Sequence, residues 1–298
     1  MLHRARLFVV AIAALATLSD AAIASTMLER IRAGQPLVIA HRDASIPFSY
    51  IDKPTGKPVG YAMDLCLHFA EALKKKAGVK TLEIKYLPVT SSNRIEAIEQ
   101  GKADIECGST SNIADRRKRV AFVIPHFITG ARLLVRADAK EQMIEDFEGK
   151  RVVSTKGSTP LTALRRLNSE RLLRLNIQEA AEHMKGVEMV EKGEADAFAM
   201  DDVLLYGLAA SRPNPAALRV TGKYLTTEAI AVMLAKSDPE AKAVFDEEIR
   251  RLILNGDMLV LYDKWFMKPI PSISAPLNMP MNYLLRSFWK FPTDFVPG

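Results

Sequence analysis

An internal repeat is the feature of this sequence that most restricts how the chain can fold. Residues 95–109 align without gaps on residues 187–201, which lie 92 positions later, and five of the aligned residues are identical. In each copy a short helical pattern ends at a glycine, and an apolar strand pattern that opens with Ala-Asp follows. Two copies of one helix–strand unit predict two similar α/β lobes, each of which carries one copy.

The segments around the first copy predict a parallel sheet. Strand patterns over 37–41, 82–87 and 103–107 alternate with helical patterns over 61–76 and 93–100. This β-α-β-α-β order requires parallel strands, and ligands bind at the C-terminal ends of such strands. We therefore expect the polar loops that follow these strands to form the functional site.

A second unit begins after a long connection. Residues 120–136 are too long and too extended for one more short strand, and we interpret them as the connection that leaves the first lobe. Residues 151–155 then form a strand pattern, and a helical pattern covers 161–167. Pro160 suits the first position of that helix, because its fixed backbone angle and missing N–H group are tolerated there.

The chain is expected to cross between the lobes twice. An apolar strand over 228–235 returns to the first lobe, and the tail from Pro269 contains five further prolines, so we expect it to wrap the surface irregularly. Two crossings imply a hinge, and small molecules bind preferentially in clefts between such lobes. The predicted divisions are a signal peptide over 1–24, a first lobe over 25–130 and 230–298, and a second lobe over 131–229.

Two loops of the first lobe are expected to have no regular structure. Residues 42–50 leave the C-terminal end of the first strand pattern as a loop, and residues 53–58, which contain two prolines and a glycine, are typical of a turn.

The N-terminus indicates the cellular compartment. Arg4 and Arg6 precede an apolar stretch over 7–18, and Ala22-Ile23-Ala24 has the small-x-small pattern of a cleavage site. This pattern is typical of a cleaved secretory signal, and we expect an exported protein; a retained membrane anchor is the alternative. The formal charge is +6, but basic and acidic residues alternate without an aromatic–basic surface pattern, which disfavours nucleic-acid binding.

The chain contains two cysteines, Cys66 and Cys107. In an oxidising compartment, two cysteines suggest one disulfide bond. Two buried free thiols are the alternative.

A group of hydrogen-bonding residues follows the third strand pattern. The residues after Cys107 are small and polar, among them Ser109 and Ser111, and Arg116 lies shortly beyond them. Hydroxyl and backbone N–H groups at a strand end, with an arginine nearby, can form a carboxylate pocket. A polar turn before a solvated basic helix is the alternative interpretation.

The second unit offers a matching set of polar residues. Thr155 and Ser158 lie at the loop before a helix, where they form a second anion site or simply cap the helix. The repeat aligns Ser109 with Asp201, and the same offset aligns Ser91 with His183. If the lobes face each other, the four residues of these two aligned pairs line one cleft.

Six motifs carry a resemblance to a known family, and they span about residues 36–280. They are HRDASIPFSY (41–50), GYAMDL (60–65), TSSNR (90–94), ECGSTSN (106–112) with Arg116, FAMDD (198–202) and WFMKPIP (265–271). Together they resemble the type II periplasmic solute-binding proteins of ABC importers, and more narrowly the glutamate/aspartate-binding proteins of proteobacteria. The resemblance implies an α/β fold of the two-lobed type II class, in which two hinge strands join the lobes.

The resemblance also implies how a ligand is held. Arg116 would bind the α-carboxylate of an amino acid, and Asp201 would bind its ammonium group. A second set would bind the side-chain carboxylate, and a third would add hydrogen bonds. The second set is Arg42, Ser91, Arg94 and His183; the third is Ser109, Ser111, Thr155 and Ser158.

This sequence departs from the family pattern at two features. Ser111 and Ser158 replace threonines that are common in the narrower family, which keeps the hydroxyl groups but loses methyl contacts. Relatives pair the Cys107 equivalent with a cysteine on the return strand, where this chain has Val232-Met233. A Cys66–Cys107 bridge within one lobe is therefore the pairing that the resemblance leaves.

The expected function is that of a monomeric periplasmic protein that binds L-glutamate or L-aspartate and delivers it to the permease subunits of an ABC importer, with no cofactor and no metal. The same fold also hosts cyclohexadienyl or arogenate dehydratases, and Glu106 would be the nearest candidate for their general acid. We take binding without catalysis as the main prediction, because the cleft residues are mostly arginine, serine and threonine.

Overall fold

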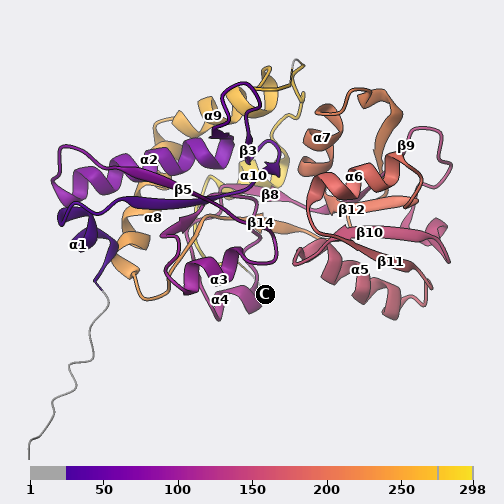
Figure 1. Cartoon of the computed structure of the whole chain (residues 1–298), viewed down its shortest axis with the longest axis horizontal. Coiled ribbons are helices and arrows are strands. Elements are labelled where there is room, and N and C mark those ends of the chain that lie inside the picture. The colour runs from indigo at the N-terminus through magenta and orange to yellow at the C-terminus, as the bar shows by residue number, and fades with distance from the viewer. Residues whose placement is uncertain (1–24, 274, 297–298) are drawn as a thin grey trace, which may run out of the picture.

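Two five-stranded sheets form the framework of the protein, one in each of two lobes (Figure 1). The computed structural model describes residues 25–273 and 275–296. The predicted signal peptide, residues 1–24, lies outside the described residues. No helix in the described part of the chain is long and apolar enough to span a membrane. The prediction of two similar α/β lobes is confirmed.

The first sheet has the strand order β5-β1-β6-β15-β7. The central strand pairs, β1 with β5 and β1 with β6, are parallel, whereas β15 pairs antiparallel with both β6 and β7. Its strands are β1 (Leu37–His41), β5 (Ile84–Pro88), β6 (Ile105–Glu106), β7 (Ala121–Phe122) and β15 (Met233–Leu234).

The second sheet repeats this arrangement with the order β11-β10-β12-β9-β13. Strand β10 pairs parallel with β11 and β12, and β9 pairs antiparallel with β12 and β13. The two sequence repeats therefore occupy matching places, α3 and β6 in one lobe and α6 and β12 in the other. The elements are α3 (Arg94–Glu99), α6 (His183–Glu191), β9 (Ala131–Arg136), β10 (Arg151–Thr155), β11 (Asn176–Ala180), β12 (Ala197–Asp201) and β13 (Leu218–Thr221).

Helix α2 (Tyr61–Ala77) shows why the longer helices form where the sequence predicts them. Its apolar residues recur at helical spacing and are buried, and lysines occupy its last turn, where they oppose the helix dipole. Gly78 ends the helix with φ 73°, a left-handed conformation that glycine adopts without strain. The Phe69 ring stacks on Phe245 of helix α8 (Pro239–Leu254) at 4.6 Å between ring centroids.

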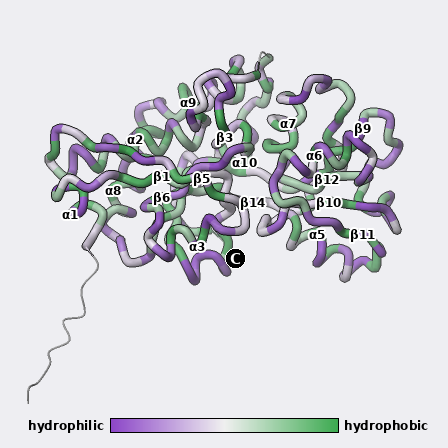
Figure 2. The backbone as a smooth tube through the Cα atoms, in the orientation of Figure 1, coloured by the Kyte–Doolittle hydropathy of each residue, from purple (hydrophilic) through white to green (hydrophobic). Residues whose placement is uncertain are grey.

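The remaining helices cover the sheets and the C-terminal region. The first lobe contains α1 (Met27–Arg32), α4 (Ala114–Arg117), α9 (Asp257–Tyr262), a π-helical turn (Asp263–Met267) and α10 (Tyr283–Phe288). The second lobe contains α5 (Thr159–Glu170), α7 (Asp202–Ala210) and two 3-10 turns (Ile144–Phe147 and Pro215–Ala217). Figure 2 shows hydrophobic stretches in the interior of both lobes.

The loop and turn expected over 42–58 form a small antiparallel sheet instead. Its strands are β2 (Ala44–Ser45), β3 (Ser49–Ile51) and β4 (Pro58–Val59), in the order β2-β3-β4. Strands of two or three residues are too short to produce a periodic pattern. Gly60 packs so closely on this sheet that a Cβ atom would lie 2.2 Å from the Phe48 carbonyl oxygen.

The outgoing connection contains three short strands, and the return contains two short strands in place of the expected single strand over 228–235. Residues 120–136 form β7, β8 (Phe127–Thr129) and β9, and residues 228–235 form β14 (Glu228–Ile230) and β15. Each segment serves a lobe sheet and the separate β8–β14 ladder between the lobes, so it must bend. A Cβ atom on Gly130 would lie 2.2 Å from the Thr226 carbonyl oxygen, so no side chain fits where the crossings touch.

Two smaller expectations are also wrong. The tail contains helix α10, whose N-cap is Asn282 and whose Leu285 is buried against the core. Helix α5 begins at Thr159 and is capped by Ser158, so Pro160 occupies its second position rather than its first.

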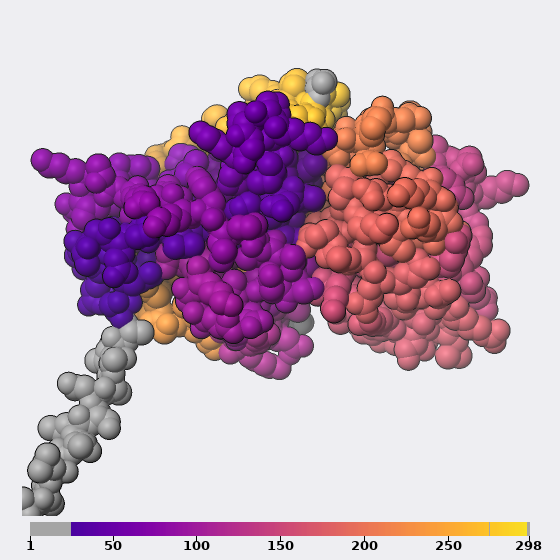
Figure 3. Space-filling view, viewed as in Figure 1, coloured from indigo at the N-terminus to yellow at the C-terminus, as the bar shows by residue number. Residues whose placement is uncertain are grey.

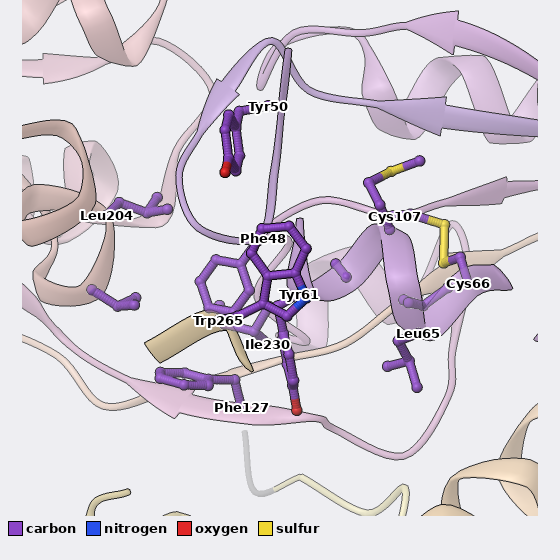
Figure 4. Close-up of a cluster of buried hydrophobic side chains, with 14 of the residues drawn as sticks. Phe48, Tyr50, Tyr61, Leu65, Cys66, Cys107, Phe127, Leu204, Ile230 and Trp265 are labelled. Carbon is purple, nitrogen blue, oxygen red and sulfur yellow. A yellow bond between two sulfur atoms is a disulfide. The ribbon is translucent and has the colours of Figure 1, made fainter. Parts of the chain in front are cut away.

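A disulfide bond joins Cys66 of α2 to Cys107 at the end of β6, with 6.3 Å between the Cα atoms. Both cysteines are fully buried in the main core cluster, which also contains Phe48, Tyr61 and Trp265 (Figure 4). Leu204 of the second lobe belongs to the same cluster, so apolar packing continues between the lobes. The predicted pairing within one lobe is confirmed.

Replacing both cysteines by alanine should lower the free energy of unfolding by about 4 kcal/mol, because the bridge closes a loop with a sequence separation of 41. Denaturant unfolding of the double variant measures this loss, and wild-type protein in dithiothreitol is the control and should behave similarly. Alkylation of both thiols in denatured, unreduced wild-type protein would contradict the bond.

His126 should make the protein less stable in acid. Its ring is fully buried, neither ring nitrogen has a hydrogen-bond partner among the described residues, and burial lowers its pKa from 6.5 to about 3. Between these values the unfolded chain binds more protons, so stability is complete above pH 6.5 and falls as the pH drops. Between these two pKa values, His126 should lower the free energy of unfolding by about 1.4 kcal/mol for each unit that the pH falls.

Denaturant unfolding of His126→Phe at pH 7 and pH 4.5 tests this effect. The variant should lose less stability between the two pH values than the wild type does. Tyr61→Phe changes a buried neighbour of His126 that stays uncharged in this pH range, because burial raises the pKa of Tyr61; this control should keep the wild-type dependence. Equal pH dependence of His126→Phe and wild type would show that His126 is not the group responsible.

Candidate functional site

The candidate site lies where strand ends of the two lobes face each other across the junction, which Figure 3 shows as a seam between the lobes. In the first lobe β1 leads into Arg42, and β6 leads into the loop that contains Ser109 and Ser111. In the second lobe β10 ends at Thr155 and β12 ends at Asp201. The site therefore uses corresponding strand ends of both sheets, in agreement with the parallel-sheet expectation.

All ten residues predicted for the site from the sequence are buried. They are Arg42, Ser91, Arg94, Ser109, Ser111, Arg116, Thr155, Ser158, His183 and Asp201. Polar and charged side chains are rarely buried without a partner, so this concentration requires an explanation.

Three arginines are the dominant charges of the site. Arg42, Arg94 and Arg116 are only 0%, 3% and 7% exposed. The pKa of Arg94 is lowered to about 9, chiefly by burial and also by the neighbouring Arg116 and Arg42 cations, against the opposing effect of Glu106 and Asp201. Burial also lowers the pKa of Arg116. Guanidinium groups buried this close together strongly favour an anion between them.

Arginine side chains also connect the two lobes. Arg116 donates hydrogen bonds to the Ser111 carbonyl oxygen at 3.0 Å and, across the junction, to the Gly157 carbonyl oxygen at 3.2 Å. Arg42 pairs through Nη2 with Glu182 of the second lobe at 2.8 Å. These contacts hold the lobes together around the site.

Several buried polar atoms of the site have no hydrogen-bond partner within the described ranges. They include donors, namely Nε and Nη1 of Arg42 and Nε of Arg94, and one carboxylate oxygen, Oδ1 of Asp201. The Ser91 hydroxyl belongs to the same group. Leaving such groups unpaired costs free energy, so the arrangement suits a polar ligand with both anionic and cationic groups.

Asp201 supplies the negative end of the site. Burial raises its pKa well above the usual value, and the nearby Glu228 and Asp202 carboxylates raise it further, whereas Arg94 and Arg116 lower it. A ligand ammonium group beside Asp201 would favour the ionised carboxylate.

His183 contributes an uncharged ring to the site. Burial lowers its pKa well below 6.5, and the Arg42 and Arg94 cations lower it further, so the ring is neutral near pH 7. Its Nδ1 atom is hydrogen-bonded to the Thr155 hydroxyl at 2.8 Å, and its Nε2 atom lies 3.5 Å from Arg42 Nη2. His183 can therefore form hydrogen bonds to a ligand but adds no positive charge of its own.

Apart from that of Ser91, the hydroxyl groups of the site already have local partners. Ser109 lies 3.3 Å from the Ser45 hydroxyl. Ser158 donates to the Thr155 carbonyl oxygen at 2.7 Å and accepts from the Leu161 N–H group, which caps α5. The structure thus contains the capping role that the sequence offered as the alternative for Ser158.

Two further carboxylates, those of Glu106 and Glu228, are buried in the site. Glu106 accepts a hydrogen bond from Thr110 at 2.7 Å, and its Oε1 atom is buried without a partner among the described residues. A Cβ atom on Gly108 would lie 2.1 Å from this Oε1 atom, so a side chain does not fit at position 108. Glu228 accepts hydrogen bonds from Thr226, Ser111 and Thr159. The sequence predicts only that Glu228 begins the return strand over 228–235. The one sign that it belongs to the site is that a charged residue stands at the start of an apolar strand.

No group of three or more potential metal-ligating side chains suitable for an ion occurs in residues 25–273 and 275–296.

Residues 37–268 match the family described as bacterial extracellular solute-binding proteins, family 3. The chain is also 40% identical over 267 residues to the L-glutamate/L-aspartate-binding protein of Pseudomonas aeruginosa, covering 90% of this chain and 88% of that protein. It is 37% identical to the glutamate/aspartate import solute-binding protein of Salmonella typhimurium, covering 91% and 89% respectively.

Among solved structures, a mutant of ArgBP from T. maritima has the same fold. It superposes with a TM-score of 0.71 at 23% sequence identity, covering 81% of this chain and 99% of that one. This likeness supports the two-lobed architecture.

Proposed function

Because the chain belongs to the bacterial extracellular solute-binding proteins, family 3, we propose that it binds L-glutamate and L-aspartate as the substrate-binding component of an ABC amino-acid importer. Relatives named for glutamate and aspartate are 37–40% identical over most of the chain. They are solute-binding proteins, which favours binding over the dehydratase alternative. The family places the working protein outside the cytoplasm.

The observation that carries the proposal is the opposition of charge in the buried site. Unpartnered N–H groups of Arg42 and Arg94 lie in the first lobe, and the unpartnered Asp201 oxygen lies in the second, within the described ranges. An acidic amino acid has two carboxylates and one ammonium group. Its carboxylates can accept from the arginine N–H groups, and its ammonium group can donate to the Asp201 oxygen.

Each group of the ligand has a proposed partner. Arg116 binds the α-carboxylate, and Asp201 binds the ammonium group. Arg42 and Arg94 bind the side-chain carboxylate through their free N–H groups. Hydrogen bonds from the surrounding side chains complete the site, namely those of Ser91, Ser109, Ser111, Thr155, Ser158 and His183.

Ligand binding is coupled to lobe closure in this proposal. The lobes comprise residues 25–130 with 230–298, and residues 131–229, and the ligand favours the form in which both lobes contact it. The membrane permease subunits recognise that form. The exported protein is a monomer released by cleavage of residues 1–24.

Isothermal titration calorimetry with glutamate, aspartate, glutamine and histidine tests the ligand class. We expect heat of binding with the first two amino acids. Binding of glutamine or histidine without binding of the acidic pair would reject the assignment, and turnover of prephenate or arogenate would favour the dehydratase alternative.

Arginine substitutions should separate the two carboxylate sites. Arg116→Met should weaken every amino acid that the wild type binds by about a hundredfold or more, because a charge-assisted contact common to all of them is lost. Arg42→Met and Arg94→Met should weaken only the acidic ligands by a similar factor. Calorimetry of each variant measures these losses.

Arg166→Met is the matched control, because this side chain is 63% exposed on helix α5. It should bind like the wild type. Equal loss of acidic and neutral ligands in Arg42→Met would contradict a role in recognition of the side-chain carboxylate.

A further inference from the structure

Glu228 lies at the point where the chain returns from the second lobe to the first. It is the first residue of β14, which forms the ladder between the lobes with β8. Its side chain is buried, and its Oε1 atom accepts a hydrogen bond from Thr226 at 2.7 Å. Its Oε2 atom accepts hydrogen bonds from both Ser111 and Thr159.

The two hydroxyls on Oε2 come from different lobes. Ser111 lies in the loop after β6 of the first lobe, and Thr159 is the first residue of α5 in the second lobe. Their oxygen atoms are 3.0 Å apart. One carboxylate oxygen therefore bridges the lobes beside the candidate ligand site.

Although Glu228 falls at the end of the range 131–229, β14 is held to the first lobe, so only the contact with Thr159 separates when the lobes move apart. The Ser111 segment is fixed to β14 by backbone hydrogen bonds, from Asn112 N–H to Ala229 at 2.8 Å and from Ala231 N–H to Thr110 at 3.0 Å. Thr159 belongs to the rigid start of α5 and moves with the second lobe. Lobe opening thus breaks the Thr159–Glu228 bond and leaves Ser111–Glu228 intact.

A count of hydrogen atoms assigns a direction to the Ser111 hydroxyl. A carboxylate only accepts hydrogen bonds, and each hydroxyl has one hydrogen to donate. Both hydrogens are directed to Glu228, so the Ser111 oxygen offers only lone pairs to a ligand. It can accept from an ammonium group, but it cannot donate to a carboxylate.

We propose that Glu228 is a positioning residue that couples lobe closure to the ligand site through Ser111 and Thr159. We call Ser111, Glu228 and Thr159 the hydroxyl clasp. The clasp holds the lobes closed and presents Ser111 to the ligand as a hydrogen-bond acceptor. This inference rests on the proposed binding function, and it adds a closure contact that does not depend on the ligand's side chain.

Thr159→Val tests the clasp with a substitution of similar shape. Release of radiolabelled L-glutamate and L-aspartate into excess unlabelled ligand gives the dissociation rates. We expect the variant to release both ligands about tenfold faster, by an equal factor, because a hydrogen bond to a charged group is lost. Small-angle X-ray scattering of the protein without ligand should give a larger radius of gyration than wild type.

Three further variants make the test specific. Thr162→Val changes an exposed threonine on the same helix and should match the wild type. Thr159→Ser keeps the hydroxyl and should restore slow release. Glu228→Met keeps a side chain of similar length but has no oxygen to accept from Ser111 and Thr159, so it should also speed release of both ligands.

The outcomes separate the clasp from the proposed function. If the wild type binds neither acidic amino acid, the proposed function fails and the clasp fails with it. If the wild type binds them but Thr159→Val keeps the wild-type release rates and radius of gyration, the clasp alone is wrong. Faster release of only one ligand would also overturn it, because Thr159 would then contact the ligand side chain.

Discussion

Burial of three guanidinium groups at the junction of two lobes is the constraint on which the rest of the structure depends. Arg42, Arg94 and Arg116 are almost inaccessible to solvent, and burial of a charge is costly unless opposite charges are close. Those opposite charges come from both lobes, as Glu106 in the first and Glu182 and Asp201 in the second. Neither lobe alone completes the charge balance, so the site exists only where the lobes meet.

The repeated topology explains how these charges reach one place. Each sheet has parallel central strands, and the C-terminal ends of β1, β6, β10 and β12 all point toward the junction. The two repeat copies end in different chemistry, since the first leads to serines and Arg116 and the second ends at Asp201. One architecture used twice therefore produces a site with a positive side and a negative side.

The sequence supported prediction of the long elements and of the residues at strand ends, because both leave periodic or positional signals. Prediction failed for strands that are too short to show a period and for segments that belong to two sheets. Strands β2 and β4 have two residues each, which is too short to show a period. The crossings bend because each belongs to two sheets, and the local sequence pattern does not indicate such a bend. The role of Glu228 depends on Ser111 and Thr159, which are distant in sequence, so only the assembled junction brings it out.

Backbone contacts limit how closely the lobes approach, and Arg42 and Arg116 connect the lobes within that limit. A Cβ atom on Gly157 would lie 2.7 Å from the Ser91 carbonyl oxygen, and one on Gly207 would lie 2.4 Å from the Ile46 carbonyl oxygen. Both glycines belong to the second lobe, and both of their neighbours belong to the first. Because the main chain limits the approach distance, the N–H groups of Arg42 and Arg94 that have no partner within the described ranges can be specialised for ligand charge. Thr159 lies outside the proposed ligand contacts, so a change at Thr159 should alter closure without altering the charges that recognise the ligand.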